Sequence, residues 1–344
     1  MPAIPWTRRH FAFATAAVVA APALRAQGKV EKSKISIAVG GKAGFYYLPL
    51  TIAEQLGYFK DEGLNVKISD FAGGSQSLQA VVGGSADVVS GAFEHTINMQ
   101  AKKQSMIAFV QMGRAPQISI GISKAKAATY KGPADLKGLK MGVSAPGSST
   151  NIILNAFLAK GGLKPNDVSV IGVGTGAGAV AAVKSGQIDG TSNTDPVMTK
   201  LEMEGSVKII ADTRNMKGTE ALFGGPMPAA SLYAPTKWVK ENPNTVQALT
   251  NAIVRADKWI AKASATDVAK TVPPAYVLGD QALYMFSFDK IKDAVSTDGM
   301  IDPVGVKNTL KVLASYNPEL KPAEIRLDET FTNEFVKKAN AKYK

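Results

Sequence analysis

Short hydrophobic runs alternate with glycine loops and helical patterns near the start of the chain. Ile35–Val39 is an apolar run rich in β-branched residues, which predicts a buried strand. A glycine loop follows it, and the apolar positions of Leu50–Phe59 lie on one face of a predicted helix. The succession repeats with a strand at Val66–Phe71, a helix through Leu78–Val82 and a strand at Ala86–Val89. This βαβαβ order predicts a parallel sheet.

A second block of the chain follows the same plan. Strands are predicted at Leu139–Val143 and Val168–Val173, each followed by a loop of small residues and a helical pattern. Gly74 of the first block aligns with Gly176 of the second at an offset of 102 residues (176 − 74). We therefore predict two lobes built on one supersecondary plan. The alternative is a chance match of glycine-rich loops.

The connections between the blocks predict how the lobes are joined. The predicted strands Ile118–Ser123 and Ala229–Tyr233 are placed to cross between the two lobes. We expect lobe 1 to comprise residues 34–115 plus 231–344 and lobe 2 to comprise residues 116–230. Two connections would then form a hinge, and the fold class would be α/β with two mostly parallel sheets and a cleft between them.

Four glycine-rich loops follow predicted strands and precede predicted helices, at residues 40–46, 72–75, 145–150 and 174–178. The carboxyl ends of parallel strands share one edge of a sheet. Two such edges that face each other would form a cleft lined by helix N-termini, whose free N–H groups and dipoles favour an anion. The sequence therefore predicts a cleft for a small anion, unless each loop hydroxyl only caps its own helix.

The candidate ligand contacts come from these loops and from one further strand end. Glycines allow a ligand to approach the backbone closely, and hydroxyls donate hydrogen bonds to it. The aromatic residues either form a flat wall of the cleft or pack within lobe 1. His95 follows the third predicted strand and so lies near the same edge of the sheet, although a lone histidine commonly has a structural role. The candidates are Gly44, Phe45, Tyr46, Gly74, Ser75, His95, Ser148, Ser149 and Thr150.

Composition excludes several kinds of site. The chain has 344 residues, 45% of them hydrophobic, and no cysteine, which rules out disulfides and thiolate metal sites. Only His95 remains as a histidine after the first 26 residues and no acidic cluster is evident, so we expect no metal. No glycine loop matches a nucleotide motif, so we expect no cofactor.

The formal net charge of +12 raises the question of nucleic acid binding. The lysines are scattered, however, and only the tail Lys337–Lys344 is dense in them. We therefore expect no nucleic acid partner. A solvated basic surface, or long-range attraction of a small anion, accounts for this charge.

Residues 1–26 have the pattern of an export signal peptide. Arg8 and Arg9 precede an apolar stretch over residues 11–23, and small residues then allow cleavage after Ala23 or Ala26. Thirteen apolar residues are too few to span a bilayer as an ordinary helix. We expect export to the periplasm by the twin-arginine or the general route. The alternative is an alanine-rich first helix of a cytosolic protein.

Two stretches, GFYYLPLTIAEQLGYFKDEGLNVKI and FAGGSQSLQAVVGGSADVVSG, resemble solute-binding proteins of nitrate, taurine and alkanesulfonate ABC importers. Related thiamine-precursor-binding proteins share this pattern, and the resemblance covers nearly the whole chain after residue 26. It implies a type II-like periplasmic-binding-protein fold that delivers a solute to a membrane permease driven by an ATPase. It also implies polar cleft residues at Asn193 and Asp195, of which Asn193 suits an anion better.

The solute class and the rival functions remain open at this point. The aromatic cluster and the neutral hydroxyl loops favour a sulfonate or an organic or aromatic carboxylate, with Arg114 as the nearest possible clamp. We expect a monomer without enzymatic activity. The rivals are a pyrimidine-precursor-binding protein and an enzyme on the same fold, of the pyrimidine-synthesising or menaquinone-pathway type, in which Glu94 and His95 would perform acid–base chemistry. The cysteine-rich motif of the pyrimidine synthases is missing here.

Overall fold

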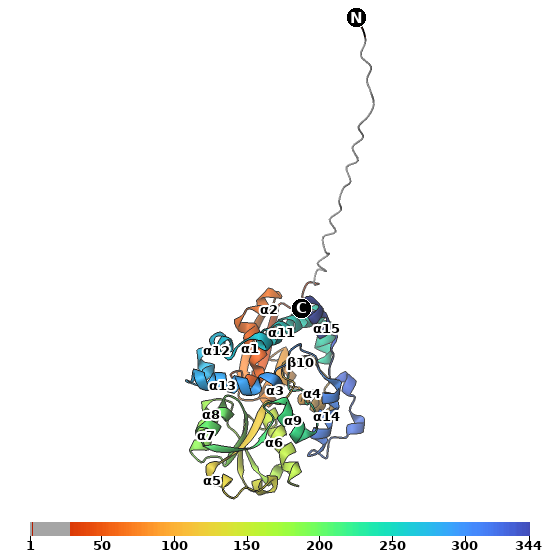
Figure 1. Cartoon of the computed structure of the whole chain (residues 1–344). Helices are drawn as coiled ribbons and strands as arrows, with labels where there is room; N and C mark the ends of the chain where they lie inside the picture. Colours follow the sequence, from red (N-terminus) through yellow and green to blue (C-terminus); the bar gives the residue numbers. More distant parts are fainter. Residues whose placement is uncertain (1, 3–27) are drawn as a thin grey trace.

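The computed structural model describes Pro2 and residues 28–344 and shows two lobes (Figure 1). The export signal predicted over residues 1–26 lies outside the described residues, apart from Pro2. Each lobe is built on one five-stranded sheet with helices packed around it. The predicted α/β fold with two mostly parallel sheets is confirmed, while the exact residue boundaries of the lobes stay a prediction.

The two sheets have the same strand order. Sheet 1, the centre of lobe 1, contains in spatial order β2 (Asn65–Phe71), β1 (Lys34–Gly40), β3 (Val88–Ala92), β10 (Ala230–Pro235) and β4 (Met106–Gln111). Sheet 2, the centre of lobe 2, contains β7 (Ser169–Gly172), β6 (Lys140–Val143), β8 (Gly190–Thr194), β5 (Ile118–Ser123) and β9 (Val207–Asp212). In each sheet a single strand, β10 or β5, runs antiparallel to its neighbours. The shared order confirms that both lobes follow one plan.

The helices fill the connections between strands and the C-terminal third of the chain. Around sheet 1 they are α1 (Leu48–Gln55), α2 (Tyr58–Asp61), α3 (Gly74–Val82), α4 (Glu94–Ala101), α10 (Thr236–Glu241), α11 (Pro243–Lys262), α12 (Ala265–Thr271), α13 (Gln281–Ile291), α14 (Pro303–Ala314) and α15 (Glu334–Lys342). Around sheet 2 they are α5 (Lys124–Ala127), α6 (Ser149–Lys160), α7 (Ala177–Lys184), α8 (Val197–Met203) and α9 (Met216–Phe223). No helix in this described part of the chain is both long and apolar enough to cross a bilayer.

Two predicted elements differ from the structure. The helix expected over Leu50–Phe59 is two helices, because Gly57 between them has φ +75°, in the left-handed region that ends a helix. The strand expected to begin at Ala86 begins at Val88 instead. Before it, the backbone N–H of Asp87 donates to Ser36 while the Asp87 carboxylate accepts from Ser36.

The core of lobe 1 is completed from the far end of the chain. Helix α11 begins with Pro243 in its first turn, where a missing N–H costs nothing, and buries Val246, Leu249, Ile253 and Ile260. It packs on α1 and α15, so the first and last parts of the described chain share one core.

Two segments, residues 112–117 and 213–229, join strands of sheet 1 to strands of sheet 2, and the second of them contains α9. These connections lie side by side: the N–H of Ala229 donates to the carbonyl of Gly113 at 2.9 Å, and the N–H of Gln117 donates to that of Thr213 at 2.9 Å. Two adjacent connections restrict relative motion of the lobes to bending about one region. The strands predicted to cross between the lobes, Ile118–Ser123 and Ala229–Tyr233, lie instead within sheets 2 and 1 as β5 and β10, and the segments that cross precede them.

Candidate ligand-binding site between the two lobes

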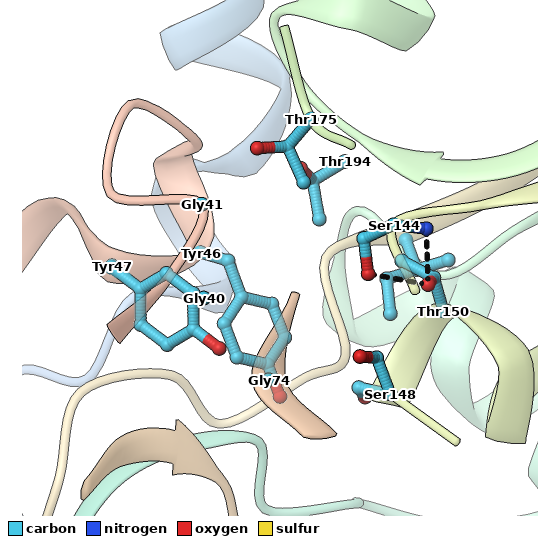
Figure 2. Close-up of a pocket in the computed structure, with 12 residues that line it drawn as sticks. Gly40, Gly41, Tyr46, Tyr47, Gly74, Ser144, Ser148, Thr150, Thr175 and Thr194 are labelled. Atoms are coloured by element: carbon cyan, nitrogen blue, oxygen red, sulfur yellow. Dashed lines mark hydrogen bonds between the residues drawn. The ribbon is translucent and has the colours of Figure 1, made fainter. Parts of the chain in front are cut away.

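The four glycine-rich loops meet where the carboxyl ends of the two sheets face each other. They enclose a small space, here called the inner cavity, with a volume of about 20 Å³ (Figure 2). Its lining residues are Gly40, Gly41, Tyr46, Tyr47, Gly74, Ile118, Ser144, Ser148, Ser149, Thr150, Thr175 and Thr194. Five are serine or threonine residues of lobe 2 in the stretches 144–150 and 175, and a sixth, Thr194, ends β8.

The lobes touch each other directly at this cavity. The backbone N–H of Ser75 donates to Ser148 Oγ at 3.0 Å, and Ser75 Oγ donates to the carbonyl of Pro146 at 2.8 Å. At another point of the interface, the N–H of Phe45 donates to the carbonyl of Asp195 at 3.0 Å. These bonds join residues of different lobes, so the structure represents a closed arrangement.

Helix N-termini from both lobes border the inner cavity. Helix α3 begins at Gly74 and α6 begins at Ser149, and both residues line the cavity. Their first N–H groups have no partner within the helix, and their dipoles put positive potential at this end. None of the described residues that line the cavity carries a charged side chain. Partial charges of the backbone and neutral hydroxyls are therefore what an anion would meet here.

Two hydroxyl groups on the inner cavity are buried without a hydrogen-bond partner. They belong to Tyr46, in the first helical turn after the Gly40–Gly44 loop, and to Thr194, at the end of β8. A buried polar group that stays unpaired costs about 1–3 kcal/mol. Figure 2 shows Tyr46 and Thr194 on different sides of the cavity, with the Tyr46 ring extending toward Gly74 and away from Thr194.

Glu94 is a buried carboxylic acid beside this cavity. It is 1% exposed, and its carboxylate accepts a hydrogen bond from the hydroxyl of Ser149 in the other lobe. Burial raises the pKa of Glu94 to about 7, against the hydrogen bonds from Ser149 and from its own backbone, which lower this pKa. Glu94 is therefore only partly ionised near neutral pH, which lessens the negative charge beside the cavity.

His95 is held between the two lobes as a neutral ring. Its Nε2 lies 3.3 Å from the carbonyl of Gly147, which can only accept, so Nε2 carries the proton. Its Nδ1, 2.9 Å from the hydroxyl of Tyr233, then accepts from that hydroxyl. Burial is the main cause that lowers the pKa of His95 to about 4. Both ring nitrogens are thus occupied in the closed arrangement.

The predicted contacts fall into two groups by position. Five of them line the inner cavity: Tyr46, Gly74, Ser148, Ser149 and Thr150. Ser75 and His95 lie immediately beside it, in the contacts between the lobes. Direct contact of any of these residues with a solute stays a prediction.

The remaining predicted residues have other partners. Phe45 packs on Tyr284 with ring centroids 4.4 Å apart, and Gly44 lies against Thr194. The side-chain amide of Asn193 donates to the carbonyl of Gly174. None of these three predicted residues is among those that line the cavity.

Two acidic or basic candidates are also placed away from the cavity. Asp195 accepts from the N–H of Thr199, and one of its carboxylate oxygens lies 3.7 Å from Arg214. Arg114, the possible clamp, donates from Nε to the carbonyl of Asp293 at the connection between the lobes. The structure thus gives Asp195 a capping role in α8 and leaves Arg114 outside the inner cavity.

Some lining residues were not among the candidates. Ser144 and Thr194 each end or directly follow a buried strand, and this position could have identified them. Gly40, Gly41 and Thr175 lie in the glycine-rich loops and could have been included with them. Ile118 begins a crossing strand, and no feature of its sequence indicates a cavity.

Comparisons with known proteins agree with this architecture. The sequence model of the NMT1-like family matches residues 28–272. A solved structure of a protein from Bordetella bronchiseptica RB50 is 60% identical, has a TM-score of 0.90, and covers 92% of this chain and 99% of that chain. The periplasmic nitrate-binding protein NrtA from Synechocystis PCC 6803 has a TM-score of 0.69 at 18% identity, covering 92% of this chain and 90% of that chain.

Curated relatives match over shorter stretches. A putative aliphatic sulfonates-binding protein of Escherichia coli K12 is 27% identical over 200 residues, which are 58% of this chain and 62% of that protein. A 4-amino-5-hydroxymethyl-2-methylpyrimidine phosphate synthase of Schizosaccharomyces pombe is 27% identical over 172 residues, 50% of this chain and 48% of the synthase. The match spans less than two thirds of either relative. The resemblance found in the sequence is confirmed at the level of the family, and the chain belongs to the NMT1-like family, with the two-lobe fold of periplasmic binding proteins.

Proposed function

We propose that this protein is the periplasmic solute-binding component of an ABC importer. It captures a small organic anion, a sulfonate or a carboxylate, in the inner cavity, and its closed form delivers the anion to a membrane permease driven by an ATPase. The relative named for aliphatic sulfonates supports this class of solute. The predicted export signal supports the periplasmic location.

The observation that carries this proposal is the pair of helix N-termini at the inner cavity. Gly74 begins α3 in lobe 1 and Ser149 begins α6 in lobe 2, so an anion between them would be held from both lobes at once. Such an anion would stabilise the closed arrangement more than the open one, which is what shifts a two-state hinge on binding. The unpaired hydroxyls of Tyr46 and Thr194 add donors of the right kind.

The match to a pyrimidine phosphate synthase keeps an enzyme or a pyrimidine-binding protein as the second candidate. Glu94 and His95 would be its acid–base groups. In the closed arrangement both nitrogens of His95 are engaged, and the Glu94 carboxylate is bonded to Ser149. Neither group is free to take a proton from a substrate in that state, which favours the binding protein.

A thermal-shift screen of residues 28–344 tests the proposal. The protein is first unfolded and refolded to remove any bound solute. The panel contains sulfonates, aliphatic and aromatic carboxylates, inorganic anions and pyrimidines. A solute at 100 times its dissociation constant adds about 2.7 kcal/mol to the free energy of unfolding, which is a readable shift.

The outcomes separate the candidates. Stabilisation by sulfonates or carboxylates, confirmed by calorimetric titration, is the expected result. Stabilisation by pyrimidines alone would favour the second candidate. No shift with any organic anion would overturn the proposed function.

A further inference from the structure

A second and larger cavity, here called the outer chamber, lies beside the inner cavity. Its volume is about 570 Å³, within the usual range of about 300–1,000 Å³ for small-molecule sites. It is formed by α3 and α4 of lobe 1, by α6 of lobe 2 and by residues 316–320 after α14. Because both lobes contribute to it, the outer chamber exists in this form only when the lobes are closed.

The two cavities share one wall. Gly74 and Ser148 line the inner cavity, whereas their chain neighbours Ser75 and Gly147 line the outer chamber. The dividing wall consists of contacts between the lobes: Ser75 to Ser148 and Pro146, and His95 to Gly147. Each of these hydrogen bonds breaks when the lobes separate, so the wall opens with the hinge.

The inner cavity by itself is too small for an organic anion. Its volume of about 20 Å³ holds about one water molecule. A sulfonate or carboxylate group with any attached carbon is larger than that. The loops around the cavity must therefore move apart to admit the anion, and movement at the dividing wall joins the inner cavity to the outer chamber.

The lining of the outer chamber suits an uncharged group. Gln79, Asn98 and Gln104 line the chamber with amide side chains that make no hydrogen bond among residues 28–344, those of Gln79 and Gln104 being solvent-exposed. Leu78 and Ile152 add apolar surface. The charged residues of this lining, Lys102 and Glu319, have opposite signs. Unpaired amides can donate to and accept from a ligand without a charge on it.

We propose that the solute has two parts, an anionic head in the inner cavity and an uncharged tail in the outer chamber that bears apolar carbon and hydroxyl or amide groups. This inference rests on the proposed function, because it assumes that the inner cavity binds the anion. In the bound protein the tail passes through the opened dividing wall, so the junction of head and tail lies at that wall. Selectivity among anions with the same head then depends on α3, α4 and α6.

Calorimetric titration with matched sulfonates tests this inference. The probes are methanesulfonate, straight-chain alkanesulfonates of increasing length, and two long sulfonates of equal length that end in an amide or an ammonium group. Affinity should rise about fourfold for each added methylene group until the chamber is filled. The amide-ended probe should bind more tightly than the ammonium-ended one.

Two matched variants locate the tail. Gln79→Trp fills part of the outer chamber, whereas Gln187→Trp makes the same change at an exposed residue after α7 that does not line either cavity. Gln79→Trp should remove most of the gain with tail length and leave methanesulfonate affinity unchanged. Gln187→Trp should behave like the unmodified protein.

The results distinguish this inference from the proposed function. Equal affinity of the protein for short and long sulfonates would overturn the two-part solute while leaving anion binding in place. The same holds if Gln79→Trp weakens the affinity for short and long sulfonates equally. Absence of binding by any sulfonate or carboxylate would overturn the proposed function and the inference together.

Discussion

Glu94 makes the free energy of unfolding depend on pH. Its pKa is about 7 in the folded protein, against 4.5 for an unperturbed glutamate, because the carboxyl is buried at the interface of the lobes. Between these values the folded state binds more protons than the unfolded state, so stability from this group falls as pH rises from about 4.5 to 7. Glutamine at this position cannot ionise, so the variant lacks this decrease in stability with rising pH.

We therefore expect Glu94→Gln to gain stability relative to the unmodified protein as the pH rises. The gain should reach about 1–3 kcal/mol between pH 5 and pH 8, measured by urea unfolding at both values. Comparing the variant with the unmodified protein at each pH cancels the other titrating groups. If the two proteins differ in free energy of unfolding by the same amount at pH 5 and pH 8, the raised pKa assigned to Glu94 is contradicted.

Tyr46 tests whether an unpaired hydroxyl is kept for the solute. Its hydroxyl has no hydrogen-bond partner among the described residues, so Tyr46→Phe should leave the midpoint of thermal unfolding unchanged or slightly raised. Binding of an anion should weaken by about 1–3 kcal/mol, because a hydrogen bond to a charged group is lost. Tyr284→Phe, which changes a buried tyrosine outside the cavity lining, is the control and should leave affinity unchanged.

Single residues of the site were only partly predictable from the sequence. Ser148, Ser149 and Thr150 were predicted because they follow a strand and begin a helix, a position that is fixed locally. The direction of the Phe45 ring could not be predicted, because this ring packs on Tyr284, which lies 239 residues later in the chain (284 − 45). Side-chain direction depends on such distant partners, and no local pattern reports them.

At the scale of elements, the N-terminus of α3 is positioned where the backbone at Gly40, the end of β1, closely approaches the backbone at Gly73 and Gly74. A Cβ atom on Gly40 would lie 2.1 Å from the carbonyl carbon of Gly73 and 2.2 Å from the nitrogen of Gly74. Both are backbone atoms, so a side chain at residue 40 would push the start of α3 away. The glycine at this position therefore sets the distance between sheet 1 and the anion-facing end of the helix.

We expect Gly40→Ala to destabilise the protein by about 1–3 kcal/mol and to weaken anion binding, through overpacking against a fixed backbone. Gly176→Ala is the matched control, since nothing lies within 4 Å of its Cβ and its φ of −127° is open to alanine. Chemical unfolding and calorimetric titration of both variants check this. Equal destabilisation by the two changes would contradict the role of the close approach.

Strands and the larger helices were largely predictable because buried runs and glycine breaks are local signals. The strands β1, β2 and β6 were found in this way. The break at Gly57 was missed because glycine within a helical pattern is often tolerated, and its left-handed φ is decided by the packing of α2. Elements are thus encoded locally, whereas their exact ends depend on tertiary contacts.

At the scale of the whole molecule, the contacts across the cleft allow the closed arrangement to be trapped. Ser75 Oγ and Ser148 Oγ are 3.1 Å apart, and the chain contains no cysteine that could interfere. The double variant Ser75→Cys, Ser148→Cys should form a disulfide on oxidation, after a small adjustment of the two loops. The lobes would then be unable to separate.

We expect the oxidised double variant to bind no added anion and to recover binding on reduction. Solution X-ray scattering should show a smaller radius of gyration for the oxidised form than for the reduced, ligand-free form. The single variant Ser75→Cys under the same oxidation is the control. Undiminished binding by the oxidised double variant would show that the solute enters without separation of the lobes.

The place of β10 within sheet 1 sets an order in which the newly made chain can fold. All five strands of sheet 2 lie between residues 118 and 212, so lobe 2 can form as soon as that segment is complete. Sheet 1 must wait for β10, which fits between β3 and β4 and is not made until residue 235. Until then β3 and β4 expose unpaired backbone groups, which are templates for aggregation. The middle of this chain can thus fold before its beginning, and residues 34–111, which contain β1 to β4, are the part that a chaperone would most need to protect.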